Sequence, residues 1–433
     1  MAGEDRISWL PVEVIVSILC RLEVKDAIRT AALARSWRHL WTYLPCLRIG
    51  SFIDEDAVGF PEGIKPVASS WIEGVHHVVS SLRGPLLHFA LCHRFSSAQS
   101  ALLQCLLDLL LQKGSIETLK LESDLDRVVI HLPLFRSLKE LELFLCRLVL
   151  PADFQGFDCL SSLTLGAVKI SNDDLHLLIH LSKNLTTFNG YSFVPFGDQR
   201  VSIKLNSSSL RYLELNINEY VEEVKVVSAP YLEHAEIRNC AFIDFEKSAS
   251  VNLGLVTSTA ATVSSLNLNF GVLESLSFAA LPLNFTFPRV RQLKLVLDIR
   301  TMDKSMYGAF IWLLRSMLCL EELNVELDDY LFDPRDDVLM RELRELLLKR
   351  HRGLSCLNQT LKHVRIGMVN LNGVLTGIPL VKFFLLNARV LELMKVAHWT
   401  GSKVERMIKE LQKVKVASSS KAKVMMIPSE RRM

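Results

Sequence analysis

The sequence predicts an α/β fold in which a small helical module precedes a solenoid of short parallel strands. Two observations lead to this prediction. Apolar residues recur at helical spacing in the first fifty residues, and a leucine pattern returns at nearly constant spacing from residue 116 onward. At 433 residues the chain is too long for one ordinary core, which also favours a repeat array or several domains.

The N-terminal module is predicted to contain two helices. The segment "LPVEVIVSILCRL" begins at residue 10 and places Pro11 at the helix start, with one apolar stripe: Val12, Ile15, Leu19 and Leu22. A second helix is expected from about Lys25 through "AIRTAALARSWRHLWTYL", with these residues on one face: Leu33, Trp37, Leu40, Trp41 and Leu44. So small a module buries a modest share of its surface, so we expect a partner or the next domain to cover the tryptophans. The alternative is that this stripe only packs on the first helix.

The leucine pattern is clearest in "LKELELFLCRL" at residues 138–148, which fits L-x-x-L-x-L-x-x-C-x-L. Copies start at residues 116, 138, 160, 185, 210 and 232, and less regular copies start at 273, 290 and 320. In a solenoid of this kind each repeat supplies one parallel strand whose leucines point inward, and stacking of repeats closes the core. An ordinary α/β sheet is the alternative, but it does not predict this template.

Residues 5–49, "DRISWLPVEVIVSILCRLEVKDAIRTAALARSWRHLWTYLPCLRI", resemble the F-box that opens plant F-box/leucine-rich-repeat proteins. Small departures from the family pattern are Trp9, Val12, Ala34 and Ser36. Residues near the C-terminus resemble the FBD domain of plant F-box proteins. The resemblance implies an N-terminal α-helical F-box, a leucine-rich-repeat solenoid in the form of a parallel-strand horseshoe, and a C-terminal α/β FBD-like cap. The corresponding boundaries are 5–50 for the F-box, 51–115 for a joining region, 116–345 for the repeats and 355–430 for the FBD-like domain.

The resemblance also implies a function. It predicts a non-catalytic substrate-recognition subunit of a Skp/cullin/F-box-type ubiquitin-protein ligase, in which the F-box binds a Skp-type adaptor and, through it, a cullin scaffold. By position in the motif, the adaptor-binding residues would be Leu10, Pro11, Ile15, Leu19, Leu22, Leu33 and Trp37. One alternative is a leucine-rich-repeat interaction scaffold without a ubiquitin role. Another is a hydrolase within residues 51–115, which no Ser, Cys or His constellation supports.

The target-binding surface is predicted from the residues that alternate with the inward leucines, because successive side chains of a strand point to opposite faces. Acidic residues outnumber basic ones at these positions. We therefore hypothesise that this face captures a basic segment of a target protein, with aromatic side chains contacting Lys or Arg. A solvated polar face without a partner is the alternative. The residues singled out are Glu140, Glu142, Phe144, Tyr191, Tyr212, Glu214, Glu236 and Glu322.

Catalytic and cofactor motifs give no support to an enzyme. The sequence has no phosphate-binding loop, dinucleotide fingerprint or nucleophile elbow, and its nine cysteines form no C-x-x-C pair. His176 and His180 lie four residues apart but lack an evident third metal ligand, so we expect no metal and no cofactor. A formal net charge of +3 argues against nucleic acid as a partner, and the basic segments 346–353 and 403–423 are interpreted as solvated helix surfaces.

The expected compartment follows from the N-terminus and the apolar runs. Charged residues within the first twenty positions disrupt the plan of a secretory signal, and the richest apolar run, at residues 101–112, is too short to span a bilayer. We therefore expect a cytoplasmic or nuclear protein with no membrane contact.

Overall fold

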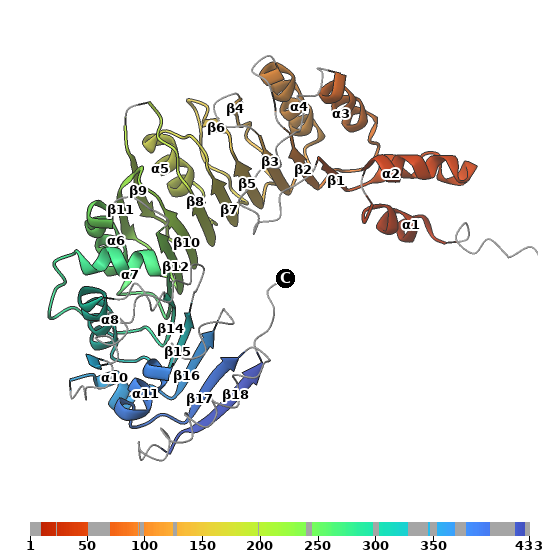
Figure 1. Ribbon diagram of the computed structural model, residues 1–433. Coiled ribbons are helices and arrows are strands. Elements are labelled where there is room, and N and C mark those ends of the chain that lie inside the picture. Colours follow the sequence, from red (N-terminus) through yellow and green to blue (C-terminus); the bar gives the residue numbers. More distant parts are fainter. Residues whose placement is uncertain are drawn as a thin grey trace, which may run out of the picture. The chain divides into compact units, whose positions relative to one another are not determined.

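The structure is a computed structural model, shown in Figure 1. It forms two compact units, Met1–Leu210 and Arg211–Met433. Each unit combines parallel strands with helices, and a helical module precedes the strands of the first unit, which confirms the predicted fold class. The residues described are 10–22, 24–50, 70–93, 95, 99–123, 128–197, 199–239, 245–297, 303–327, 345–346, 353–368, 378–398 and 421–428.

The N-terminal module contains α1 (Val12–Leu19) and α2 (Val24–Arg29), followed by three short 3₁₀ turns. These turns are η1 (Thr30–Ala32), η2 (Arg35–Trp37) and η3 (Leu40–Tyr43). The prediction of one long second helix is therefore wrong. Ala34 adopts an extended backbone with φ −152° and ψ 154°, which no helix can continue through, and the Trp37 amide instead donates to the Ala34 carbonyl at 3.0 Å.

The strands of the first unit form one parallel sheet, with neighbours in the order β1-β2-β3-β5-β7-β8. Leucines and phenylalanines at alternate strand positions are buried, as the leucine pattern predicts. The bounds are β1 (Cys46–Ile49), β2 (His88–Cys92), β3 (Thr118–Glu122), β5 (Glu140–Phe144), β7 (Ser162–Gly166) and β8 (Thr187–Tyr191). Short strands β4 (Val129–His131) and β6 (Arg147–Val149) pair with each other.

The sheet begins earlier in the chain than the leucine pattern indicates. Strand β2 lies within the predicted joining region and pairs with β3, and β1 pairs with β2. Helices α3 (Ser70–Ser81) and α4 (Ser100–Lys113) flank β2 in the sequence. Their buried residues, Leu47, Phe89 and Leu91, fit the leucine template, but copies starting at residues 44 and 86 fall outside the nearly constant spacing from which the array is predicted. The boundaries between F-box, joining region, repeats and FBD-like segment stay predictions.

A hydroxyl group just before each of the strands β3, β5, β7, β8 and β10 (Tyr212–Ile217) donates to a backbone carbonyl of the preceding repeat. The pattern recurs at distances from 2.8 to 3.0 Å between the hydroxyl and the carbonyl oxygen. The donor and acceptor residues are Ser115 and Leu86, Ser137 and Ile116, Ser161 and Lys139, Thr186 and Ser161, and Ser209 and Leu185. We call this set the hydroxyl ladder.

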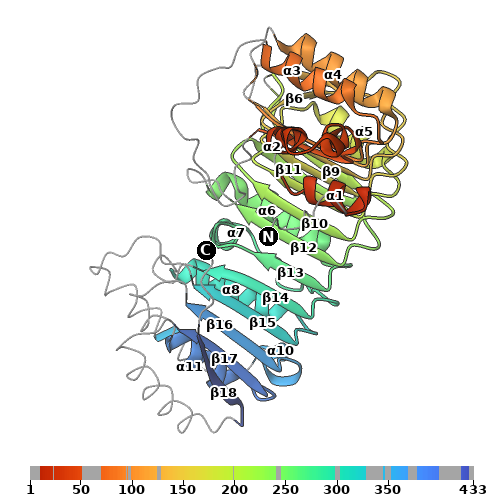
Figure 2. The same cartoon turned by 90° about the vertical axis from the view of Figure 1, so that its right-hand side faces the viewer.

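The second unit repeats the parallel arrangement, with strands in the order β10-β12-β13-β14-β15-β16-β17-β18 (Figure 2). The last three strands belong to the predicted FBD-like segment and continue the sheet of the repeats. The bounds are β10 (Tyr212–Ile217), β12 (His234–Asn239), β13 (Ser265–Leu268), β14 (Gln292–Leu297), β15 (Glu322–Leu327), β16 (His363–Met368), β17 (Leu393–His398) and β18 (Lys423–Pro428).

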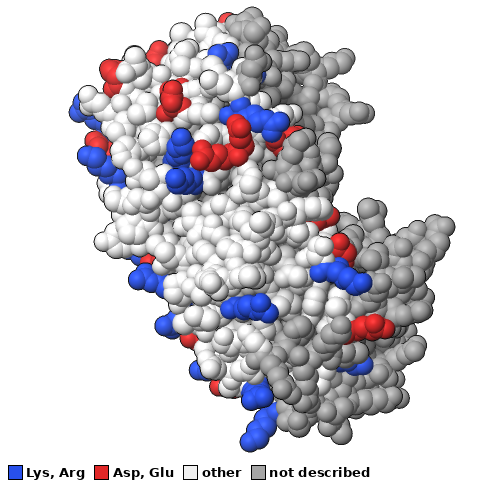
Figure 3. Space-filling model, turned by 90° about the vertical axis from the view of Figure 1, so that its left-hand side faces the viewer, with Lys and Arg blue, Asp and Glu red and all other residues white. Residues whose placement is uncertain are grey.

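Helices connect many of these strands. They are α5 (Asn172–Leu181) in the first unit, and α6 (Phe245–Thr259), α7 (Phe270–Ser277), α8 (Lys304–Ser316), α10 (Ser355–Gln359) and α11 (Ile378–Asn387) in the second. In Figure 1, α6, α7 and α8 lie on one side of the strands of their unit, and Figure 3 shows a broad area of uncharged side chains on that side. No helix within the described residues is long and apolar enough to cross a membrane.

Candidate functional site

Helix α1 carries apolar residues on two sides. The Val14 and Ile15 amides donate to the Pro11 carbonyl at 3.0 and 3.1 Å, which starts the helix at the predicted residue. Ile15 is buried, whereas Val14 and Ile18, one turn apart, are each 42% exposed. The whole segment VEVIVSIL has only Glu13 and Ser17 as polar residues, so burying one stripe leaves a second apolar stripe in solvent.

The module exposes large apolar side chains that together could bury area against a partner. We call this set the N-terminal apolar surface: Val12, Val14, Ile18, Leu22, Leu33 and Tyr43. Full burial of such a side chain contributes about 1.5–3 kcal/mol, so several of them exposed on one small module indicate a binding surface.

The seven residues predicted to bind the adaptor differ in solvent exposure. Pro11, Leu22 and Leu33 are exposed and Leu10 is partly exposed, whereas Ile15, Leu19 and Trp37 lie in the interior of the module. Trp37 keeps 6% of its surface exposed and Leu33 keeps 74%, so they do not share a face as predicted. The break at Ala34 separates them. Val14 and Ile18 were not singled out from the sequence, although the nearly all-apolar composition of α1 was a signal for a second apolar stripe.

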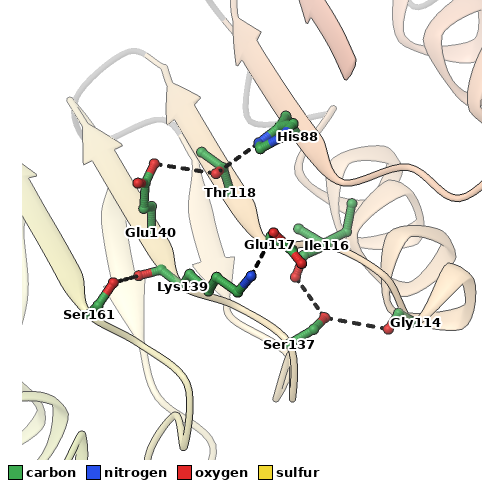
Figure 4. Close-up of polar contacts among 9 residues, drawn as sticks. All are labelled: His88, Gly114, Ile116, Glu117, Thr118, Ser137, Lys139, Glu140 and Ser161. Atoms are coloured by element: carbon green, nitrogen blue, oxygen red, sulfur yellow. Dashed lines mark hydrogen bonds and ion pairs between the residues drawn. The ribbon is translucent and has the colours of Figure 1, made fainter. Parts of the chain in front are cut away.

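The outward residues of the strands in the first unit lie in rows because the strands are paired in register. Figure 4 shows His88, Thr118 and Glu140 on neighbouring strands, with Thr118 Oγ1 3.0 Å from His88 Nδ1 and 3.3 Å from Glu140 Oε2. The same view shows Ser137 and Ser161 of the hydroxyl ladder beneath this row. Glu140 therefore points outward, as predicted, and accepts a hydrogen bond within the face.

Glu142 and Phe144 also point outward on β5, but both contact a lysine. Lys120 Nζ lies 2.9 Å from a carboxylate oxygen of Glu142 and 5.2 Å from the centre of the Phe144 ring. The Phe144 ring rests on Gly166, where an added Cβ would lie 2.3 Å from a ring carbon. Tyr191 follows Gly166 in the same register row and is half-buried. The predicted cation–π contact of Phe144 is thus made by a residue of the same face.

The predicted acidic residues of the second unit are likewise engaged. Arg238 donates to Glu236 at 2.8 Å and lies 3.5 Å from Glu214, and Asn267 donates to Glu236 at 3.1 Å. Burial acts to raise the pKa of Glu236, but these hydrogen bonds and the nearby positive charges hold it below the ordinary value. The excess of acidic residues in the sequence therefore becomes a mixed polar face in the structure.

Two further predicted residues, Glu322 and Tyr212, occupy exposed positions. Glu322 accepts a hydrogen bond from Gln292 at 3.2 Å and lies 3.5 Å from the His363 imidazole. The Tyr212 ring lies 6.1 Å from that of His234 on the next strand. Capture of a basic target segment by this face stays a prediction.

Glu122, at the end of β3 in the first unit, has a buried carboxyl group. Burial raises its pKa above the ordinary value of 4.5, whereas a hydrogen bond from Cys92 and the charge of Lys120 act in the opposite direction. Because the folded chain then holds this proton more tightly than the unfolded chain, the free energy of unfolding decreases as the pH rises from about 4.5 through the raised pKa.

We therefore expect Glu122→Gln to stabilise the first unit at neutral pH and to give no such gain at pH values below the ordinary pKa. Chemical denaturation at both pH values measures the difference. Glu236→Gln is the matched control with the opposite sign. The folded-state pKa of Glu236 is depressed, so the ionised Glu236 carboxylate stabilises the fold at neutral pH and loses this effect as the pH falls. Glu236→Gln removes the stabilisation and should therefore lower the free energy of unfolding at neutral pH. Equal effects of both substitutions at neutral pH would contradict this assignment.

The two histidines that lie four residues apart in the sequence both belong to α5. The His176 and His180 rings stack at 5.7 Å on α5, and no group of three or more His, Cys, Asp or Glu residues suited to a metal occurs in the described ranges. Residues 347–352 of the basic segment 346–353, and residues 403–420 of the segment 403–423, lie outside the described residues.

Comparison with known proteins adds two family matches. Residues 7–49 match the F-box domain, and residues 103–255 match the LRR repeats of FBD-associated F-box protein At5g56370. The first match contains the N-terminal apolar surface, and the second contains strands β3 to β12.

Individual relatives come from Arabidopsis thaliana. The chain is 28% identical to F-box/FBD/LRR-repeat protein At1g13570 over 58% of each protein, and 26% identical to F-box/LRR-repeat protein At3g26922 over 57% of this chain and 86% of the relative. It is 48% identical to FBD-associated F-box protein At5g22730 over 14% of each. The chain thus spans 58% or less of the length of two of these relatives.

Proposed function

Because the chain is an F-box/leucine-rich-repeat protein of plant type, we propose that it is the substrate-recognition subunit of a Skp/cullin/F-box-type ubiquitin-protein ligase. In this role the F-box binds a Skp-type adaptor, which connects the chain to a cullin scaffold. The outward face of the strands binds a protein target. The chain has no catalytic role and increases the local concentration of target near the ligase, in the cytoplasm or the nucleus.

The N-terminal apolar surface is the observation that supports this proposal most directly. Val14 and Ile18 form an exposed stripe of α1 beside its buried residues, and Leu33 projects from the turn that follows α2. These side chains lie within the F-box match, and the F-box is the domain that implies adaptor binding. An interaction scaffold without a ubiquitin role remains the second candidate, since the strand face would serve either function.

We expect Ile18→Ala combined with Leu33→Ala to weaken adaptor binding by about tenfold or more, since centrally placed apolar contacts contribute about 1–2 kcal/mol each. The melting temperature should stay at the wild-type value because both side chains are exposed. Titration of the purified full chain with a Skp-type adaptor measures the affinity.

The matched control is Leu111→Ala combined with Leu177→Ala, which removes exposed leucines from α4 and α5. Adaptor affinity should be unchanged in this control. Wild-type affinity in the Ile18/Leu33 variant would refute the assigned surface. Adaptor binding without recovery of a cullin in the same complex would favour the scaffold.

A further inference from the structure

Charges on the outward face of the second unit are distributed unevenly among its strands. Strands β10, β12 and β15 carry outward glutamates, each within an ion pair or hydrogen bond. Strands β16, β17 and β18 have the sequences HVRIGM, LMKVAH and KVMMIP, which contain no acidic residue. Their outward charged residues are Arg365, Lys395 and Lys423.

These three cations lie close together. Arg365 and Lys395 occupy the same register position on adjacent parallel strands, which are about 4.8 Å apart. Lys423 is in register with Leu393, which places it diagonally across from Lys395. All three side chains are exposed.

Within the described part of the chain, neither Arg365 nor Lys395 has a carboxylate within ion-pair distance. The outward carboxylates of β15, the strand that pairs with β16, are engaged elsewhere. Glu326 pairs with Lys294 at 3.1 Å, and Glu322 contacts His363 and Gln292. Elsewhere on the outward face of the second unit, Arg238 and Lys294 each pair with a glutamate, so the neighbouring cations of β16 and β17 depart from the pattern.

Apolar side chains separate the cations. Leu393 precedes Lys395 by two positions on the outward side of β17, and Met425, which is 36% exposed, lies beside Lys395 on β18. Cations that alternate with partly exposed apolar groups are complementary to a peptide segment that carries carboxylates and an apolar residue. They match nucleic acid poorly, because these strands contain no Phe, Tyr or Trp on which a base could stack.

We propose that the outward face of β16, β17 and β18 binds an acidic segment of the target protein, with Arg365 and Lys395 binding its carboxylates and Leu393 and Met425 contacting an apolar side chain. This inference rests on the proposed function as a target receptor. From the sequence, the outward glutamates predict a basic target segment. The site proposed here lies on other strands, β16, β17 and β18, and binds an acidic target segment.

The test uses the purified full chain and a fluorescent glutamate-rich peptide that contains one leucine. A matched peptide has glutamine at every glutamate position. We expect the acidic peptide to bind, the glutamine peptide to bind at least about tenfold more weakly, and binding to weaken between about 0.05 and 0.15 M salt. Fluorescence anisotropy measures each affinity.

Arg365→Gln combined with Lys395→Gln should reduce the affinity for the acidic peptide by about tenfold or more. Lys225→Gln combined with Arg315→Gln removes the same charge from exposed residues on β11 (Val221–Ser228) and α8, and should leave the affinity unchanged. Equal losses in both double variants would show a general attraction to net charge and overturn the proposal.

Two other outcomes would also overturn it. One is failure of the acidic peptide to bind. The other is that an oligonucleotide of equal charge binds more tightly than the acidic peptide and that the Arg365→Gln and Lys395→Gln variant loses this binding. That result would identify the site as one for nucleic acid. Adaptor binding is measured on the same samples. If it is retained while the acidic peptide does not bind, only this inference fails, whereas loss of adaptor binding by the wild-type chain counts against the proposed function.

Discussion

We expect Trp37→Ala to destabilise the N-terminal module by about 3–5 kcal/mol, the usual cost of truncating a buried aromatic side chain. Trp37 keeps 6% of its surface exposed, and Ile15, Leu19 and Leu40 are also buried residues of this module. Amide hydrogen exchange of α1 in the full chain measures the effect, because it reports the opening free energy of the module separately from that of the strands.

Leu33→Ala is the control for this prediction. Its side chain is 74% exposed, so α1 amides should keep their wild-type protection while adaptor affinity falls. Loss of adaptor binding by the Trp37 variant would then follow from unfolding of the module and would not identify Trp37 as a contact. Unchanged exchange in Trp37→Ala would show that the tryptophan is dispensable for the core.

We expect Gly156→Ala to destabilise the first unit by roughly 2–5 kcal/mol. Gly156 has φ +93°, a conformation that costs other residues about 1–2 kcal/mol, and its added Cβ would lie 2.2 Å from the carbonyl oxygen of Leu181 at the end of α5. Leu181 is the last residue of α5, so the added Cβ meets backbone atoms and the clash displaces either the end of α5 or the segment around Gly156. Chemical denaturation measures the loss.

Gly114→Ala separates the cost of the positive φ from the cost of the clash with Leu181. Gly114 caps α4 with φ +69°, and nothing lies within 4 Å of an added Cβ, so this substitution tests the backbone conformation alone. Its cost should be about 1–2 kcal/mol. Equal destabilisation by the two variants would mean that the close approach of Gly156 to Leu181 contributes nothing to the cost of Gly156→Ala.

The strand face could be predicted from the sequence because the burial pattern of a strand has a period of two. Once Leu141 and Leu143 are assigned inward, Glu140 and Glu142 must point outward. The pairing of Lys120 with Glu142 could also have been predicted, since their separation of 22 residues equals the repeat length. The pairing of Lys294 with Glu326 could not, because the intervening connection contains α8 and its length fits no constant repeat.

The N-terminal module was harder to predict because helical periodicity assumes an unbroken helix. Leu33 and Trp37 lie four residues apart, which would align them on one face, but the extended backbone at Ala34 separates them. Nothing in the residue types marks this break, since alanine is a strong helix former. With this break Trp37 lies in the interior of the module, and such burial cannot be inferred from the periodicity of a single helical segment.

The hydroxyl ladder explains how repeats of unequal length can coexist in one sheet. Its donors at positions 115, 137, 161, 186 and 209 are separated by 22, 24, 25 and 23 residues, yet each donates to the same part of the preceding repeat. Slippage by one residue would exchange the inward and outward faces of a strand. Because the hydroxyl secures the strand entry, connections of different length are compatible with one constant alignment of the outward face.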